Sequence, residues 1–268
     1  MSIDVRWVLA AGAMLTASFA EGPHRIAGQA QSPQTVTVVA ELFTSEGCSS
    51  CPPADDVLSD LVLHQPIPGV EVLALAEHVD YWDRLGWRDR FSSAAFSARQ
   101  SDYDARVFRT DRIYTPQLVV DGQWQVVGSD AAAVGEAIRR AAAVPKATVT
   151  VDVARVPARR ELRVDLDVSV PPNLALQRDA DVLVAVVEDN LVTDVRHGEN
   201  SGRKLRHTAV VRSLTTIGAL AEDERLWSAT VSVSIDADSR PENLRVIAFL
   251  QERDTRRILG AAAARVAA

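Results

Sequence analysis

The two cysteines of this chain are the residues whose type and spacing most directly suggest chemistry. Cys48 and Cys51 are separated by two serines, and the sequence contains no other cysteine. A pair with this spacing can be a small structural disulfide, a redox-active pair or two ligands of a metal ion. A ring of four residues stabilises a fold by only about 2 kcal/mol in the loop-entropy model. A redox pair, in contrast, requires the second thiol within reach of a mixed disulfide on the first, so the spacing favours redox chemistry.

A metal site is less favoured by the composition. A closed zinc site takes four ligands, and the sequence has neither a second cysteine pair nor a spaced histidine pair. His78 is the candidate for a further ligand, which leaves a metallochaperone using Cys48, Cys51 and His78 as one alternative. For the favoured redox pair we expect neither a metal nor a cofactor.

The segments on either side of the cysteines predict a strand and a helix. Residues 35–43 form a β-branched, apolar run that is typical of a buried strand. After the cysteines, apolar residues recur at helical spacing: Ala54, Val57, Leu58, Leu61 and Val62. Cys48 is therefore expected between a strand and the first turn of a helix, where free N–H groups and the helix dipole favour the thiolate. Cys51, held inside that turn, is expected to be less exposed and to react second.

Further elements follow in alternation. Residues 69–76 predict a second buried strand, parallel to the first if a helix crosses between them, and residues 91–108 predict a helical stretch. Asp121-Gly122 is a hairpin turn signal between the apolar runs 118–120 and 124–127. An amphipathic helix with a capping residue is expected at 130–143.

This order of elements, with Cys-x-x-Cys opening the first helix and Thr115-Pro116 opening the hairpin, resembles the thioredoxin fold. The resemblance implies a cis proline that packs against the active disulfide, and it places Pro116 in that role. It also implies that Thr115 offers backbone polar groups to a bound peptide or thiol. On this basis residues 35–146 are expected to form an α/β thioredoxin-like domain.

Glu41 lies seven residues before Cys48 on the first predicted strand. In thioredoxins a buried carboxylate at about this place accepts the proton of the resolving cysteine, and the resemblance implies this role for Glu41. Burial would raise the pKa of such a carboxyl towards the working range. The alternative is a glutamate at a strand edge that points to water, because glutamate is rarely fully buried.

A longer stretch resembles a family of secreted bacterial thioredoxin-like proteins that is catalogued as a domain of unknown function. The resemblance is carried by Glu41-Leu42-Phe43-Thr44-Ser45-Glu46-Gly47-Cys48-Ser49-Ser50-Cys51-Pro52-Pro53-Ala54-Asp55, by 78–83 with 86–87, by 114–117, and by 200–202 with Leu205 and His207. It runs from about residue 35 to the C-terminus. It implies the fold and redox chemistry, but it brings no known substrate.

A segment at about 78–110 is an insertion relative to a minimal thioredoxin domain. It contains aromatic and charged residues: His78, Asp80, Tyr81, Trp82, Trp87 and Arg88. These side chains either roof the cysteines and shape substrate access or pack their rings on the core. Elsewhere, the basic cluster 203–207 either binds an anion or an acidic partner surface or is a solvated loop.

The second half of the chain, 147–268, predicts strands. Apolar and polar residues alternate in 148–153 and 162–170, and further strands are expected at 182–188, 207–212, 227–235, 244–251 and 257–262. About seven strands with turn signals between them suggest an antiparallel sandwich. The expected fold is therefore an α/β thioredoxin-like domain followed by an all-β sandwich-like domain, the latter serving for docking or dimerisation.

The N-terminus predicts export. Residues 7–20 carry no charge and end in Ser18-Phe19-Ala20, which matches a secretory signal with a small-x-small cleavage site. We expect residues 1–20 to be a signal peptide, 21–34 to be a linker, and the mature protein to be periplasmic or secreted, without a membrane anchor. The alternative is an uncleaved anchor or an N-terminal helix.

The net charge and the cysteines together suggest the function. A net charge of −7 over 268 residues argues against nucleic-acid binding. The favoured hypothesis is an extracytoplasmic thiol–disulfide oxidoreductase: Cys48 exchanges with substrate, Cys51 resolves, Thr115 and Pro116 shape the surface opposite, and Glu41 shuttles the proton. Its expected partners are protein or small-molecule thiols and disulfides, with no identified redox partner. The alternatives are a non-catalytic binding module with an inert disulfide and the metallochaperone.

Overall fold

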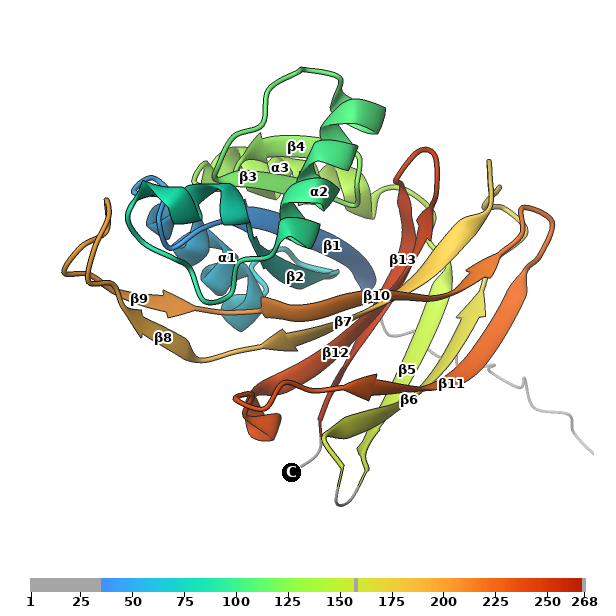
Figure 1. Ribbon diagram of the computed structural model, residues 1–268. Helices are drawn as coiled ribbons and strands as arrows, with labels where there is room; N and C mark the ends of the chain where they lie inside the picture. The colour runs from blue at the N-terminus through green and yellow to red at the C-terminus, as the bar shows by residue number, and fades with distance from the viewer. Residues whose placement is uncertain (1–34, 157–158, 267–268) are drawn as a thin grey trace, which may run out of the picture. The chain divides into compact units, whose positions relative to one another are not determined.

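Strands from both halves of the chain join in one mixed sheet of eight strands in the computed structural model (Figure 1). The structure describes residues 35–156 and 159–266, which belong to one unit. The expected signal peptide (1–20) and linker (21–34) lie outside the described residues.

The described residues form thirteen strands and six helical segments. The strands are β1 (Val36–Thr44), β2 (Val70–His78), β3 (Gln117–Val120), β4 (Trp124–Val127), β5 (Thr148–Arg155), β6 (Glu161–Ser169), β7 (Ala180–Glu188), β8 (Leu191–Asp194), β9 (Lys204–His207), β10 (Val210–Leu220), β11 (Leu226–Ser234), β12 (Leu244–Glu252) and β13 (Ile258–Arg265). The helices are α1 (Pro52–His64), α2 (Ala94–Tyr103) and α3 (Ala131–Ala142), with short helical segments η1 (Asp80–Leu85), η2 (Asp104–Phe108) and η3 (Pro241–Asn243). Within this part of the chain, no helix is both long and apolar enough to cross a membrane.

The large sheet has the strand order β13-β12-β7-β10-β2-β1-β3-β4. Strand β2 is parallel to both of its neighbours, β1 and β10, while the other pairs are antiparallel. Strands β2 and β10 meet over a single residue pair, Ala76 with Val210. The first-half and second-half strands are thus joined at one narrow seam near the carboxyl end of β2.

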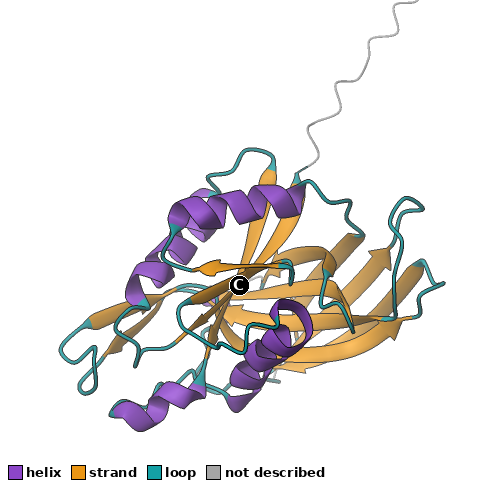
Figure 2. Ribbon diagram, turned by 90° about the horizontal axis from the view of Figure 1, so that it is seen from above, coloured by secondary structure: helices purple, strands orange, loops and turns teal. Residues whose placement is uncertain are grey.

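Both faces of the large sheet are covered (Figure 2). On one face, α1 and α3 pack against alternate residues of β1 and β2, and the three-stranded sheet β11-β6-β5 packs against alternate residues of β7 and β12. The remaining residues of the same strands form a second apolar layer with Phe96 of α2 on the other face. Strands β7 and β12 are therefore buried on both sides, in agreement with their continuous apolar runs.

The predicted fold class is wrong. The protein is mostly β, and no separate sandwich follows an α/β thioredoxin-like domain, because β7, β10, β12 and β13 extend the sheet that β1 and β2 begin. The alternation that suggested a sandwich belongs to β5 and β6, whose outer faces are exposed. The continuous runs of β7 and β12 instead indicate central strands of a sheet that is covered on both faces.

This topology brings four distant segments to one edge of the large sheet. Strands β1 and β2 end side by side, since Thr44 pairs with His78. Strand β3 begins next to the end of β1, where Gln117 pairs with Phe43. The hairpin of β8 and β9 continues from β7 and leads into β10. The cysteine loop, the residues after β2, the Thr115-Pro116 segment and the β8–β9 hairpin therefore surround one region.

Candidate active site

The cysteine loop connects the end of β1 to the start of α1. Cys48 and Cys51 form a disulfide with their Cα atoms 5.4 Å apart, and both residues are fully buried. Cys51 is the residue that caps α1, and its carbonyl oxygen accepts hydrogen bonds from Ala54 N at 2.8 Å and Asp55 N at 3.1 Å. Because prolines occupy the first positions of α1, the chain turns into the helix directly after the disulfide. The disulfide therefore lies at the positive end of the helix dipole, as the sequence predicts.

A cis peptide bond between Thr115 and Pro116 lies opposite the disulfide. The Thr115 hydroxyl donates to Cys48 Sγ at 3.4 Å, and it accepts a hydrogen bond of 2.9 Å from Trp82 Nε1. Ser50 Oγ lies 3.3 Å from Cys48 Sγ and donates to the carbonyl oxygen of Thr115 at 3.5 Å. The structure therefore brings together Cys48, Cys51, Thr115 and Pro116, and it adds Trp82 of the insertion to them.

A loop of the second half of the chain also contacts the cysteine loop. Asn200, between β8 and β9, is fully buried and donates from Nδ2 to the carbonyl oxygens of Glu46 and Cys48, both at 2.9 Å. The exposed carboxylate of Glu199 accepts a 3.0 Å hydrogen bond from the amide of Ser49. These contacts join residues about 150 positions apart in sequence, as the separations of 152 and 150 positions show. Periodicity cannot reveal them, although 200–202 belongs to the motifs that carry the family resemblance.

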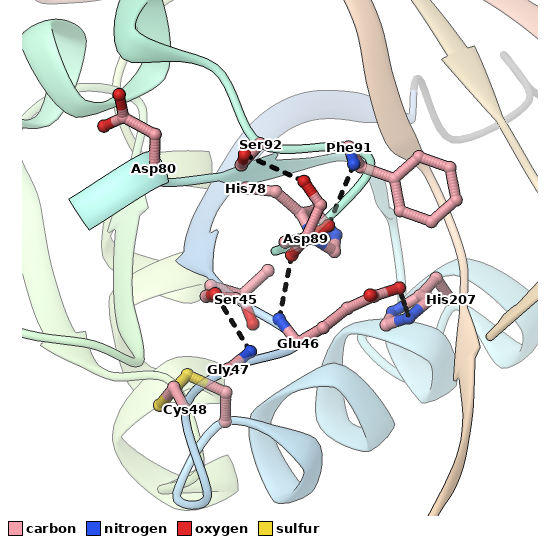
Figure 3. A network of polar contacts seen from close by, with 12 residues as sticks. Ser45, Glu46, Gly47, Cys48, His78, Asp80, Asp89, Phe91, Ser92 and His207 are labelled. Atoms are coloured by element: carbon pink, nitrogen blue, oxygen red, sulfur yellow. Dashed lines mark hydrogen bonds and ion pairs between the residues drawn. A yellow bond between two sulfur atoms is a disulfide. The ribbon is translucent and has the colours of Figure 1, made fainter. Parts of the chain in front are cut away.

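A buried network of charged and polar groups ties the insertion to the cysteine loop (Figure 3). Asp89 Oδ2 lies 2.6 Å from His78 Nδ1 and accepts from the amide of Glu46 at 2.8 Å. Glu46 Oε2 accepts a hydrogen bond of 2.8 Å from Trp87 Nε1, and Oε1 lies 3.2 Å from His207 Nε2. Trp82 and Trp87 are thus hydrogen-bonded to site residues, in addition to the buried area they contribute.

The charges of this network stabilise one another. Burial opposes protonation of His78, but the carboxylates of Asp89, Asp55 and Glu46 together outweigh it and raise the pKa of His78 above its ordinary value. Burial raises the pKa of Asp89, but the neighbouring His78 and the hydrogen bonds from backbone amides outweigh this effect and lower the pKa below its ordinary value. Asp89 therefore positions the His78 ring and favours its protonated form. Among the described residues, no group of three or more His, Cys, Asp or Glu side chains is arranged to hold a metal ion.

Asp55 is a site residue that the sequence interpretation did not assign. It lies four residues after Cys51, one helical turn away on the same face of α1. Its carboxylate accepts a 2.8 Å hydrogen bond from the Thr44 hydroxyl at the end of β1. Burial raises the pKa of Asp55 to about 6, and the nearby His207 and His78 limit this rise. The spacing from Cys51 was visible in the sequence, but the partial burial of Asp55 and its contact with Thr44 were not.

Glu41 is buried, but on the other face of the sheet. Its neighbours in the strand, Ala40 and Leu42, pack under α1 and α3, so the Glu41 side chain points to the face that α2 covers. There Glu41 Oε2 lies 2.6 Å from Arg99 Nε, and Oε1 accepts a hydrogen bond from Tyr103. Within the described residues, Glu41 has no hydrogen bond to either cysteine.

Glu77 shares the guanidinium of Arg99 with Glu41. Glu77 Oε1 lies 3.4 Å from Arg99 Nε, the residue is fully buried, and neither carboxyl oxygen has a hydrogen-bond partner among the described residues. Burial raises the pKa of Glu77 well above its ordinary value, and Glu41 raises it further. One guanidinium balances one carboxylate, so Glu77 is favoured in its neutral form.

Replacing Glu77 by glutamine is therefore expected to stabilise the protein at high pH. Since the folded pKa of Glu77 lies above its unfolded value, its contribution to stability is complete below the unfolded pKa and is lost as the pH rises through the folded pKa. The variant should gain about 1–3 kcal/mol over the wild type at pH 8 and lose this advantage towards pH 4. Thermal unfolding across this range measures the difference. A difference that does not change with pH would contradict the assignment.

The fold and the site define a mostly-β protein with a buried Cys-x-x-Cys disulfide at a helix N-terminus. The chain belongs to the family described as Protein of unknown function (DUF1223), whose model matches residues 39–251. The prediction of a family catalogued as a domain of unknown function is thereby confirmed.

The solved structures that are similar to this chain include the following two. A crystal structure of a protein from Agrobacterium tumefaciens has 28% sequence identity and a TM-score of 0.63, covering 87% of this chain and 95% of that one. HBP35 of Porphyromonas gingivalis has 15% identity and a TM-score of 0.65, covering 87% of this chain and 76% of that one, and this likeness concerns the fold alone. A comparison with curated proteins gave no match.

Proposed function

We propose that this protein is an extracytoplasmic thiol–disulfide oxidoreductase whose redox centre is the Cys48–Cys51 disulfide. The observation that carries the proposal is the position of this disulfide, at the N-terminus of α1 and in hydrogen-bond contact with Thr115 next to cis-Pro116. The Cys-x-x-Cys disulfide and the cis proline are the features that this site shares with thioredoxins, and the proposal does not depend on a thioredoxin fold. The compartment in this proposal is based on the sequence pattern of residues 1–20, which matches a secretory signal.

The exchange proceeds through one mixed disulfide. A substrate thiolate attacks Cys48 Sγ, the bond between Cys48 and substrate forms, and the Cys48–Cys51 bond breaks with both of its electrons going to Cys51. Asp55 gives its proton to the Cys51 thiolate. A second substrate thiolate then attacks the substrate sulfur of the mixed disulfide, which releases an oxidised substrate and a Cys48 thiolate stabilised by the helix N-terminus. Protein or small-molecule dithiols and disulfides are the substrate class.

In the reverse direction the same groups exchange their tasks. The Cys48 thiolate attacks a substrate disulfide, and Cys51, deprotonated by ionised Asp55, attacks Cys48 Sγ to close the ring and release the reduced substrate. Thr115 and Pro116 form the surface on which the substrate sulfur approaches. In this proposal Asp55 replaces Glu41 as the proton carrier, because Glu41 lies on the opposite face of the sheet.

A non-catalytic binding module with an inert disulfide is the second candidate. The observation that favours it is the complete burial of both cysteines. Catalysis therefore requires side chains around Cys48 to move aside. Ser50 Oγ and the Thr115 hydroxyl lie 3.3 and 3.4 Å from Cys48 Sγ, and Trp82 is hydrogen-bonded to Thr115.

The reduction potential of the disulfide separates the two candidates. We expect a value above about −250 mV when the protein is equilibrated with reduced and oxidised glutathione, because most known redox catalysts lie in that range. A double variant, Cys48→Ser with Cys51→Ser, gives the baseline for thiol labelling. A value below about −300 mV would place the disulfide among inert structural bridges and would leave the binding module as the better description.

A further inference from the structure

The loop between β8 and β9 is hydrogen-bonded to the cysteine loop. Asn200 uses both Nδ2 hydrogens, one on the carbonyl oxygen of Glu46 and one on that of Cys48. Its Oδ1 accepts a 2.9 Å hydrogen bond from Arg203. All polar atoms of this buried side chain are therefore engaged, and they fix the backbone on which Cys48 is carried.

Glu199 contacts the ring of the disulfide itself. Its Oε2 lies 3.0 Å from the amide nitrogen of Ser49, the residue that follows Cys48 inside the four-residue ring. Free amides in this ring are the groups that stabilise a Cys48 thiolate after reduction. The Glu199 carboxylate accepts the hydrogen bond of the Ser49 amide and adds a negative charge beside the cysteines.

The β8–β9 loop is itself held in a defined conformation. Gly202 N donates to Val195 O at 2.8 Å, which closes the loop at its base. Gly198 has a φ of +75°, and a Cβ atom there would lie 3.1 Å from Cβ of Trp87. The loop thus packs against the insertion, whose Trp87 is hydrogen-bonded to Glu46 of the cysteine loop. Glu199 and Asn200 are carried by a braced segment of the protein.

We propose that the β8–β9 loop controls the redox properties of the cysteine pair, with Asn200 as a positioning residue and Glu199 as the charge that disfavours the reduced form. The inference rests on the proposed oxidoreductase function. A charge that destabilises the Cys48 thiolate makes the dithiol harder to form, and so makes the protein a weaker oxidant. The second half of the chain is then part of the redox centre and not only a docking module.

Replacing Glu199 by glutamine tests the charge. The glutamine oxygen can still accept from Ser49 N, so the substitution removes the charge and keeps the acceptor. We expect the equilibrium constant for reduction of the disulfide by glutathione to rise about 3- to 10-fold, which corresponds to about 15–30 mV. The Cys48 pKa, followed by the ultraviolet absorbance of the thiolate, should fall.

Two controls accompany this measurement. Glu222→Gln removes an exposed carboxylate outside this loop and should leave both quantities unchanged. Because Glu199 is exposed, its effect should shrink as salt is added, since salt screens exposed charges. An unchanged equilibrium constant and Cys48 pKa in Glu199→Gln would overturn the role of Glu199 while leaving the oxidoreductase proposal intact. A wild-type disulfide that does not exchange with glutathione would remove both.

Asn200→Ala tests the positioning. We expect the rate of exchange with glutathione to fall about 10-fold and the reduction potential to change, because the backbone at Cys48 loses its donor. Arg203→Ala, at an exposed residue, frees only Asn200 Oδ1 and should change both quantities in the same direction to a smaller extent, which gives a readout if Asn200→Ala does not fold. A loss of thermal stability in either variant with unaltered rate and potential would assign Asn200 a structural role only.

Discussion

Cys48→Ser is expected to abolish turnover of a disulfide substrate while the protein still folds. The Cys48 sulfur is the atom that exchanges with substrate, so its loss should lower the rate at least 1000-fold, on the order of the effect of removing a nucleophile. The four-residue ring contributes only about 2 kcal/mol to stability in the loop-entropy model. Turnover of a dithiol or disulfide substrate, together with thermal unfolding, measures both quantities on the same sample.

The companion variant Cys51→Ser distinguishes the two cysteines. It keeps Cys48 and removes the resolving thiol, so it should accumulate a mixed disulfide with substrate that mass spectrometry detects. Ser228→Ala, a change at an exposed residue of β11, should retain turnover. If Cys48→Ser turned over a disulfide substrate at the wild-type rate, the oxidoreductase proposal would be abandoned. Turnover that is absent from both wild type and variant, with a stability loss of about 2 kcal/mol in the variant, would identify an inert bridge.

Asp55→Asn is expected to slow ring closure of the reduced protein about 100-fold at pH 7, the lower end of the contribution of a general acid or base. At this pH an ordinary cysteine, with a pKa of about 8.5, is mostly protonated. Asp55, whose pKa is raised by burial to about 6, is mostly ionised and can accept the Cys51 proton. Release of the product thiol from a chromogenic aromatic disulfide, followed from pH 4 to 9, measures the step.

The pH profile and a neighbouring carboxylate provide the controls. In the wild type, the rate should rise as the pH passes through about 6 and then level off, whereas in Asp55→Asn this limb should be missing. Asp56→Asn removes the same charge from the exposed neighbouring residue and should keep the limb. A wild-type profile without a limb near pH 6 would refute the role of Asp55.

Stability separates this role from a defect in folding. The folded pKa of Asp55, about 6, lies above its reference value of 3.8. Its contribution to stability is therefore present below pH 3.8 and is lost as the pH rises through about 6. Asp55→Asn, which keeps an acceptor for Thr44, should be at least as stable as the wild type at pH 7, so a slower reaction cannot be ascribed to unfolding.

The local elements of this fold could be predicted from the sequence because they depend on short-range patterns. The apolar run before the cysteines forms β1, the helical spacing after them forms α1, and Asp121-Gly122 forms the turn between β3 and β4. The helical stretch 91–108 becomes α2 and η2. These elements form where they were expected because periodicity and turn chemistry act over a few residues.

The assembly of the strands could not be predicted in this way. The alternation of apolar and polar residues in 148–153 and 162–170 indicates strands with one exposed face, but it does not show which strands pair with each other. The eight-stranded sheet arises because β7 and β12 are apolar on both faces and need cover on both sides, which α2 and the three-stranded sheet supply. Pairing of β10 with β2 joins residues more than 130 positions apart, at Ala76 and Val210.

Part of the candidate site could likewise be predicted from the sequence, and part of it depends on the tertiary structure. The sequence by itself determined the cysteine pair at a strand–helix junction and the Thr115-Pro116 segment, because both are contiguous motifs. Only the tertiary structure decided that Glu41 faces away from the disulfide, that Asp55 is partly buried with a raised pKa, and that Asn200 reaches the carbonyl of Cys48. Burial and contacts across 152 positions depend on how the strands pair, and that pairing is set by the packing of the whole sheet and not by any one segment.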